Sequence, residues 1–228
     1  MHKVAIFDID GTIFRSSLLI QIVDRMIEEG IFGTGASADF ARQKLAWLDR
    51  KGDYDAYIMA VVKVFMANIK GVEYKEFARL AEEVVAEQKD RVYRYTRDLI
   101  KNLKKKKYFL LAVSHSPKGI LDKFCTRLGF DKVYGLMYET GPTERFTGVI
   151  TEQAFMLNKA AVVKHAVAKE GLTLKGSIGV GDTESDIPFL ELVEQPICFN
   201  PNAKLYAHAK RNGWSVVVER KDVVYKIQ

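Results

Sequence analysis

The sequence predicts an α/β fold in which helices cover both faces of a parallel sheet, with an all-helical unit inserted into it. Residues 108–218 alternate short apolar runs with helical patterns, which is typical of a covered parallel sheet. Residues 15–90 show helical periodicity without a strand-like run. An apolar run at residues 4–7 precedes them, and a gap of about 80 residues is too long for a loop. The helices are therefore expected to form an insertion after the first strand.

The inserted unit contains several segments with one apolar face. In residues 19–27, leucine, isoleucine, valine and methionine recur at helical spacing, with charged residues between them. A glycine- and serine-rich break follows at residues 30–37, and the same periodicity returns in three later segments. We expect helices there at residues 40–48, 58–69 and 77–85.

The second half of the chain is expected to supply the other strands of the sheet. Gly129 and Gly171 follow two helical patterns as terminators, and glycines within residues 137–150 indicate a hairpin. The expected strands are residues 108–113, 177–180, 197–199 and 215–218, and the expected helices include residues 117–128 and 159–170. The predicted core is a Rossmann-like three-layer sandwich of residues 1–14 and 91–228, with a helical cap of residues 15–90.

Composition is that of a globular protein. The 228 residues are 48% hydrophobic and 28% charged, and no apolar run reaches the roughly 18 residues of a membrane span. The N-terminus has no apolar segment of the kind found in signal peptides. Cys125 and Cys198 lie in apolar contexts and form no disulfide framework. We therefore expect a cytoplasmic chain with reduced thiols and no membrane contact.

The net charge is +6 at pH 7, and its densest contribution is the lysine-rich run 101–107. This run ends a helical pattern, where lysines favourably meet the negative end of the helix dipole. A solvated helix end is the interpretation we favour. The alternative is attraction of anionic substrates or of nucleic acid; we expect no nucleic-acid partner.

Chemically reactive side chains follow the predicted strands. Asp8 and Asp10 come directly after the first strand, Ser114 follows residues 108–113, and Asp182 follows residues 177–180. Lys159 opens a predicted helix. Ligands of open α/β sheets bind beyond the carboxyl ends of the strands, so these groups are expected at one site. Neighbouring carboxylates repel one another unless a cation binds, and a few hard oxygen ligands suit Mg²⁺. Together they fit phosphoryl transfer to a carboxylate nucleophile.

At this point the sequence resembles a known family. The segments "DIDGT" (8–12), "LLAVSHS" (110–116) and "GVGDTESD" (179–186), together with Lys159, look like the four motifs of the haloacid dehalogenase superfamily, in order. The helical insertion and the closing segment 186–214 resemble its phosphoserine-phosphatase-like branch.

The resemblance implies roles for the matching residues. Asp8 would attack phosphorus and form an aspartyl-phosphate, and Asp10 would act as general acid and then as general base. Mg²⁺ would be held by the Asp8 carboxylate, the Asp10 main-chain carbonyl and Asp182. Asp186 would support the site by orienting Lys159 or a metal-bound water. The implied substrate- and phosphate-binding residues are Gly11, Thr12, Ser114, His115 and Lys159, and Ser114 and Lys159 also count among the catalytic residues.

Several of these residues also fit ordinary structural roles. Asp10 followed by Gly11 is a common turn signal, and Asp186 fits a helix N-cap. Ser114 or, better, Ser116 would cap the helix after Pro117. His115 fits a packed, hydrogen-bonded position as well as one that faces the substrate.

The sequence departs from the branch where substrates are read. Phosphoserine phosphatases carry a glutamate nine residues after the nucleophile, which binds the substrate's ammonium; Ser17 stands there in this chain. A serine cannot neutralise an ammonium, which argues against phosphoserine. Arg15 would instead favour an acidic or neutral leaving group. Two glycines and an asparagine of the branch are replaced by His115, Ser116 and Ser185.

The sequence thus predicts a Mg²⁺-dependent phosphatase that acts on a small phosphorylated metabolite. A phosphomutase or phosphotransferase would use the same aspartyl-phosphate and pass it to another acceptor. A non-catalytic binding protein on the same fold is the third alternative, and the intact set of Asp8, Asp10, Lys159 and Asp182 argues against it.

Overall fold

The computed structural model describes residues 1–227, apart from the side chain of Thr34. These residues form an eight-stranded sheet in the order β4-β3-β2-β1-β5-β6-β7-β8. The strands are β1 (His2–Phe7), β2 (Phe109–Pro117), β3 (Lys132–Thr140), β4 (Phe146–Thr151), β5 (Leu172–Gly181), β6 (Gln195–Phe199), β7 (Ser215–Arg220) and β8 (Val223–Ile227). The six inner strands, β3, β2, β1, β5, β6 and β7, pair with one another in parallel. The predicted parallel sheet is confirmed, and the edge strands β4 and β8 pair antiparallel.

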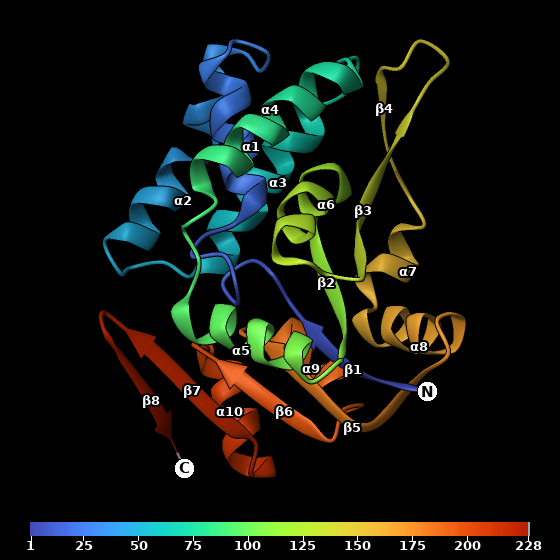
Figure 1. Cartoon of the computed structure of the whole chain (residues 1–228). Helices are drawn as coiled ribbons and strands as arrows, with labels where there is room; N and C mark the ends of the chain where they lie inside the picture. The colour runs from blue at the N-terminus through green and yellow to red at the C-terminus, as the bar shows by residue number, and fades with distance from the viewer. Residues whose placement is uncertain (228) are drawn as a thin grey trace.

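Four long helices gather at one end of the molecule, away from strands β6 to β8 (Figure 1). They are α1 (Leu18–Glu28), α2 (Ala38–Leu48), α3 (Tyr54–Asn68) and α4 (Tyr74–Gln88), and they match the helical unit expected from the sequence. The remaining helices are α5 (Arg94–Lys105), α6 (Lys118–Leu128), α7 (Gln153–Leu157), α8 (Lys159–Lys169), α9 (Ile187–Leu190) and α10 (Ala203–Asn212), with short 3-10 turns at Thr34–Ser37 and Glu184–Asp186. Within the described residues, no helix combines the length and apolarity needed to cross a membrane.

Side chains of β1 alternate between the two faces of the sheet and show how the layers are held. Val4 and Ile6 are fully buried in a cluster with residues of α8, α9 and α10. Ala5 and Phe7 are fully buried on the opposite face, in a cluster with residues of α5 and α6. Each fully buried large aliphatic or aromatic side chain stabilises the fold by roughly 1.5–3 kcal/mol. The central strand is therefore covered on both sides, as its continuous apolar run predicts.

The turn between α3 and α4 is bound to the hairpin of β3 and β4. Main-chain N–H groups donate from Gly71 to the Phe146 carbonyl at 2.8 Å and from Phe146 to the Val72 carbonyl at 2.9 Å. A third bond runs from the Tyr74 N–H to the Glu144 carbonyl at 2.8 Å. The Phe146 ring packs edge-on against Phe77 of α4, with centroids 5.4 Å apart. The hairpin thus holds the helical unit from one side.

The chain enters and leaves the helical unit at neighbouring points. The Arg15 N–H donates to the Arg91 carbonyl at 2.9 Å, and the Tyr93 N–H donates to the Ile13 carbonyl at 2.9 Å. These bonds join two short extended segments beside the carboxyl end of β1.

Strands β3 and β8 differ most from the expected strands. β3 begins at Lys132, ahead of the predicted hairpin, because its first half pairs in parallel with β2 before the second half turns into the hairpin. β8 has no counterpart among the expected strands. Its Val223, Tyr225 and Ile227 are 42%, 52% and 39% exposed, so no buried face imposes a pattern on this segment.

Candidate active site

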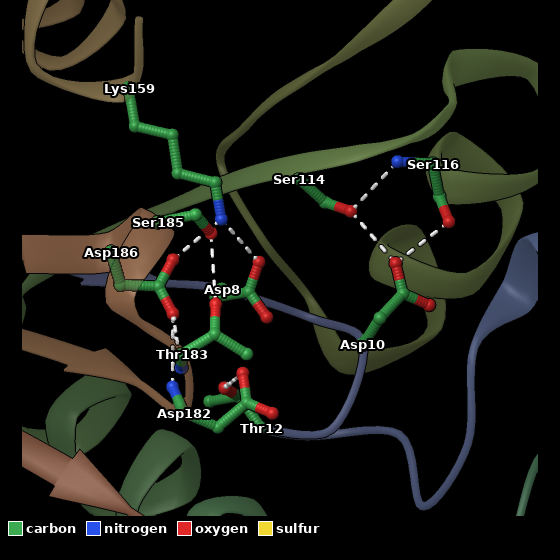
Figure 2. A network of polar contacts seen from close by, with 10 residues as sticks. All are labelled: Asp8, Asp10, Thr12, Ser114, Ser116, Lys159, Asp182, Thr183, Ser185 and Asp186. Carbon is green, nitrogen blue, oxygen red and sulfur yellow. Dashed lines mark hydrogen bonds and ion pairs between the residues drawn. The ribbon is translucent and has the colours of Figure 1, made fainter. Parts of the chain in front are cut away.

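Adjacent parallel strands bring the predicted motifs together at one edge of the sheet. β1 lies between β2 and β5, so Asp8 lies in one site with Ser114, in the last half of β2, and with Asp182, which follows β5 (Figure 2). The Asp8 N–H donates to the Val180 carbonyl at 2.9 Å, which fixes the main chain beside β5. Strand order reverses at β1, and such switch points are where open α/β sheets bind ligands.

Lys159 is a buried cation between two carboxylates. It is the first residue of α8 and only 3% exposed. Its Nζ donates to Asp8 Oδ1 at 2.7 Å and to Asp186 Oδ1 at 2.6 Å. Burial alone would lower the pKa of Lys159, but the charges of Asp186 and Asp8 outweigh it and raise that pKa. The lysine therefore stays protonated and offsets part of the local negative charge.

Asp186 uses both of its oxygens for protein contacts. Oδ1 accepts from Lys159, and Oδ2 accepts from the N–H groups of Asp182 at 2.9 Å and Thr183 at 3.1 Å. Gly181 makes room for it, since a Cβ at that position would lie 2.6 Å from Asp186 side-chain atoms. The sequence allowed a helix-capping or an orienting role, and the contacts include both the turn at Thr183 and the ammonium of Lys159.

Asp10 lies apart from Lys159, among hydrogen-bond donors. Its Oδ2 accepts from the hydroxyls of Ser114 at 2.9 Å and Ser116 at 2.7 Å, and its Oδ1 accepts from the Leu18 N–H at 2.6 Å. Burial raises the pKa of Asp10, and these three hydrogen bonds oppose the rise. The two neighbouring carboxylates therefore have different surroundings, which suits a nucleophile and a proton donor.

Three carboxylates form a group that could hold a cation. One oxygen from each of Asp8, Asp182 and Asp186 lies within 4.8 Å of the others. Burial raises the pKa of Asp8 to about 7, against the opposing pull of Lys159. The pKa of Asp182 is raised well above its usual range by burial and then by the charges of Asp8 and Asp186. A hard divalent cation would relieve this repulsion, so the donor set fits Mg²⁺.

Asp8 and Asp182 are the better candidates for metal ligands within this group. Both oxygens of Asp186 are occupied by protein donors. Asp182 Oδ1 accepts from the Thr12 hydroxyl at 3.1 Å, and the other oxygens of Asp8 and Asp182 accept no hydrogen bond from the described residues. The Asp10 carboxylate points toward the serines instead, so only its main chain remains for the role implied by the resemblance.

Gly11 lets the main chain pass close to Asp182. Its φ of +81° is in the left-handed region that favours glycine. A Cβ at this position would overlap Oδ2 of Asp182. A side chain at residue 11 would therefore displace one of the carboxylates that face the site.

A cavity of about 460 Å³ extends from these groups toward α1 and α3. His115 and Ser17 line it, together with Tyr54 of α3. Burial and then the charge of Lys159 lower the pKa of His115 to about 4, so the ring is neutral at pH 7. Ser17 is buried, and its hydroxyl lies near enough to that of Tyr54 to oppose slightly the rise in the Tyr54 pKa that burial causes. Arg15 lines a neighbouring cavity instead, with its guanidinium 5.7 Å from the Tyr93 ring.

Two residues of this site have roles other than the ones that the sequence favours. Ser116 was a candidate cap for the helix after Pro117, but α6 has no side-chain cap, and the Ser116 hydroxyl binds Asp10. The run S-H-S in an extended segment was the available signal, because alternate side chains of a strand share one face. For the aromatic residues of the inserted helices, the sequence favours the helical core and leaves a pocket lining as the alternative; these residues are Trp47, Tyr54, Tyr57 and Phe65. Tyr54 lines the cavity, as that alternative allows.

The family model described as haloacid dehalogenase-like hydrolase matches residues 5–191. A histidinol-phosphatase of Neisseria meningitidis serogroup C (strain 8013) is 26% identical over 222 residues, which cover 95% of this chain and 99% of that protein. The phosphoserine phosphatase SerB1 of Mycobacterium tuberculosis (strain ATCC 25618 / H37Rv) is 26% identical over 230 residues, with coverages of 95% and 70%.

Solved structures share the fold. A protein with unknown function from Bordetella pertussis Tohama I aligns with a TM-score of 0.72 at 20% identity, covering 95% of this chain and 98% of that one. A phospho-aspartyl intermediate analogue of phosphoserine phosphatase aligns with a TM-score of 0.60 at 19% identity, covering 97% and 95%. Both alignments extend over the sheet and the inserted helices alike.

Proposed function

The chain belongs to the haloacid dehalogenase-like hydrolases, and we propose that it is a Mg²⁺-dependent phosphatase that hydrolyses a small phosphate monoester through an aspartyl-phosphate. Phosphatases among its relatives support the class of phosphoric monoester hydrolase. The observation that carries the proposal is the paired environment of Asp8, held by Lys159, and of Asp10, held by serines. In this proposal residues 15–90 act as a cap over a core of residues 1–14 and 91–228.

Asp8 is the nucleophile of the first step. Its Oδ1 accepts from Lys159. One carboxylate oxygen attacks phosphorus in line with the ester oxygen, and the other would stay with the metal. The bond from Asp8 to phosphorus forms as the bond to the leaving oxygen breaks. Lys159 keeps the carboxylate oriented and offsets negative charge on the phosphoryl group.

Asp10 moves the proton. In the first step it gives its proton to the leaving oxygen, so the product is a neutral alcohol. In the second step it takes a proton from water as the water oxygen attacks phosphorus, which releases inorganic phosphate and restores Asp8. Burial raises the pKa of Asp10, which favours the protonated form that the first step requires.

Asp8, Asp182 and the Asp10 main chain would hold Mg²⁺. When bound, the cation supplies positive charge that keeps Asp8 and Asp182 ionised and counters charge on the phosphate. Thr12 steadies Asp182 through its hydroxyl, and Asp186 fixes the turn at Asp182 through the main chain.

Asp8→Asn tests the nucleophile. Asparagine keeps the shape but lacks a nucleophilic oxygen, so hydrolysis should fall by ~1000-fold or more. Purified protein with Mg²⁺ is assayed for inorganic phosphate released from phenyl phosphate and from a panel that includes histidinol phosphate and phosphoserine. Circular dichroism and thermal unfolding control for the fold. Normal turnover by Asp8→Asn would sink the mechanism, and phosphate transfer to an added alcohol without release would favour a phosphotransferase.

A further inference from the structure

The cavity next to the catalytic groups has two chemically distinct ends. The end at the sheet is polar and consists of the catalytic carboxylates, the two serines and Lys159. The end at the helical unit is apolar. It is formed by Leu19 of α1 and by Ile58, Met59 and Val62 of α3. A phosphate at the polar end would place the alcohol part of its ester against this apolar wall.

Positive charge is missing from the part of the cavity where the alcohol would lie. Lys159 is the one cation among the described residues that line the cavity, and it is held by Asp8 and Asp186. At the rim, Asp55 and Glu184 add negative charge. Glu184 is paired with Lys204 at 2.5 Å, and the charge of Glu184 contributes to the raised pKa of Asp55 after burial.

Arg15 does not change this balance. The sequence made it a candidate for binding an acidic or neutral leaving group, but its side chain lies beside Tyr93 in the neighbouring cavity. That cavity adjoins this one, and the two share the lining residues Tyr54, Asp55, Asp182 and Thr183. The hydroxyls of Ser17 and Tyr54 also line the cavity, and neither group carries a positive charge. A carboxylate or second phosphate on the alcohol would therefore be buried without a cationic partner, which is costly.

We propose that this cavity selects phosphate monoesters of alcohols that have an apolar body and carry no negative charge. The inference rests on the proposed phosphatase function and names its substrate class. Leu19, Ile58, Met59 and Val62 are the residues that set this preference, by contact with the apolar body. Esters such as phosphoserine, whose alcohol part bears a carboxylate, are rejected because the cavity offers that carboxylate no partner.

Two matched pairs of esters test the selectivity. Phenyl phosphate and 4-carboxyphenyl phosphate differ by one carboxylate, as do phosphoethanolamine and phosphoserine. We expect kcat/KM to be lower by ~10-fold or more for the anionic member of each pair, since an unpaired charge must be buried. The added carboxylate makes the phenolate a slightly better leaving group, so a slower reaction cannot reflect chemical reactivity. Equal or faster turnover of the anionic esters would overturn the inference.

Variants at Met59 locate the effect. Met59 is 53% exposed and lines the cavity, so a polar side chain is tolerated there. Met59→Lys should raise kcat/KM for 4-carboxyphenyl phosphate relative to phenyl phosphate by about 10-fold, and Met59→Gln, which adds no charge, should not. Arg15→Ala should leave the ratio unchanged. An unaltered ratio in Met59→Lys, or a changed one in Arg15→Ala, would contradict the assignment.

Failure of the inference and failure of the function give different results. If phenyl phosphate is hydrolysed and the reaction is lost in Asp8→Asn, the phosphatase proposal stands, and the selectivity alone decides the inference. If none of the esters releases phosphate with Mg²⁺ present, both proposals fall.

Discussion

At the scale of single residues, the site depends on space that glycines leave for carboxylates. Gly11 leaves room for Asp182, and Gly181 leaves room for Asp186. Asp186 is buried and Asp182 is partly buried, and neither can move away without losing its hydrogen-bond partners. Positions that carry no reactive group thus contribute to the site by their lack of a side chain.

Gly11→Ala should impair catalysis more than stability. The new Cβ would overlap Asp182, so we expect kcat/KM to fall by ~10-fold or more and half-maximal activity to need more Mg²⁺. Gly30→Ala is the matched control: its φ of +71° imposes similar backbone strain, and open space surrounds it. Both variants should lose about 1–2 kcal/mol in urea unfolding. Equal activity of the two variants would show that Asp182 is not displaced.

The residues of the site were predictable to different degrees. Asp8 and Asp182 directly follow apolar runs, and parallel strands carry such positions to one edge, so their meeting follows from the sequence. Ser116 was not predictable as a site residue, and nothing in the sequence singled out Tyr54 among the aromatic residues that could line a pocket. The extension of β2 to Pro117 sends both serines toward Asp10, and packing of α3 on α1 aims Tyr54 at Ser17; both depend on tertiary contacts.

At the scale of elements, the β3–β4 hairpin is the second support of the helical unit. Three main-chain hydrogen bonds and the Phe146 ring connect its tip to the α3–α4 turn. Because α3 also carries Met59 and Ile58 into the cavity, the hairpin indirectly fixes the apolar wall.

Phe146→Ala should destabilise the protein strongly. The side chain is 4% exposed and packs against Tyr74, Phe77 and Tyr138, so the cavity left behind should cost ~3–5 kcal/mol in urea unfolding. Val149→Ala in the same hairpin is the control. Its side chain is 53% exposed, and it should change stability by less than about 0.5 kcal/mol. Similar effects of the two substitutions would mean that the Phe146 contacts contribute little to the free energy of unfolding.

The elements themselves were largely predictable where burial imposes a period. Helices α1 and α4 bury leucine, isoleucine, valine and phenylalanine on one face, and that pattern is visible in the sequence. β8 escaped prediction because its large apolar residues are substantially exposed. The first half of β3 escaped because its pairing with β2 is set by the neighbouring strand.

At the scale of the whole molecule, the core carries a concentration of negative charge that weakens it. The buried acids Asp8 and Asp186 lie together with the partly buried Asp182, and one lysine offsets part of their charge. The raised pKa values of Asp8 and Asp182 mean that the fold disfavours their ionised forms. The sequence predicted that these acids gather at one edge of the sheet. It did not predict that protein donors would occupy both oxygens of Asp186.

Mg²⁺ should therefore stabilise the protein as well as activate it. At 100 times its dissociation constant a cation adds ~2.7 kcal/mol, which raises the midpoint of thermal unfolding by about 5–10 °C in a chain of this size. Asp182→Asn should abolish this shift, yet unfold no earlier than the wild type in chelator, because it removes a buried charge. Asp39→Asn, an exposed acid on α2, should keep the full shift. A wild-type midpoint indifferent to Mg²⁺ would contradict the metal assignment.

The hydrogen bond between Arg15 and Arg91 sets the start and the end of the helical unit side by side. With respect to the sheet, the whole helical unit therefore occupies the place of a short connection after β1, whatever the number of residues in it. A segment of different length or sequence could join the same two points, because both ends lie side by side, without changing the register of the strands. A replacement that kept the Leu18 N–H on Asp10 would leave the end of β1 as it is while changing the residues that line the cavity.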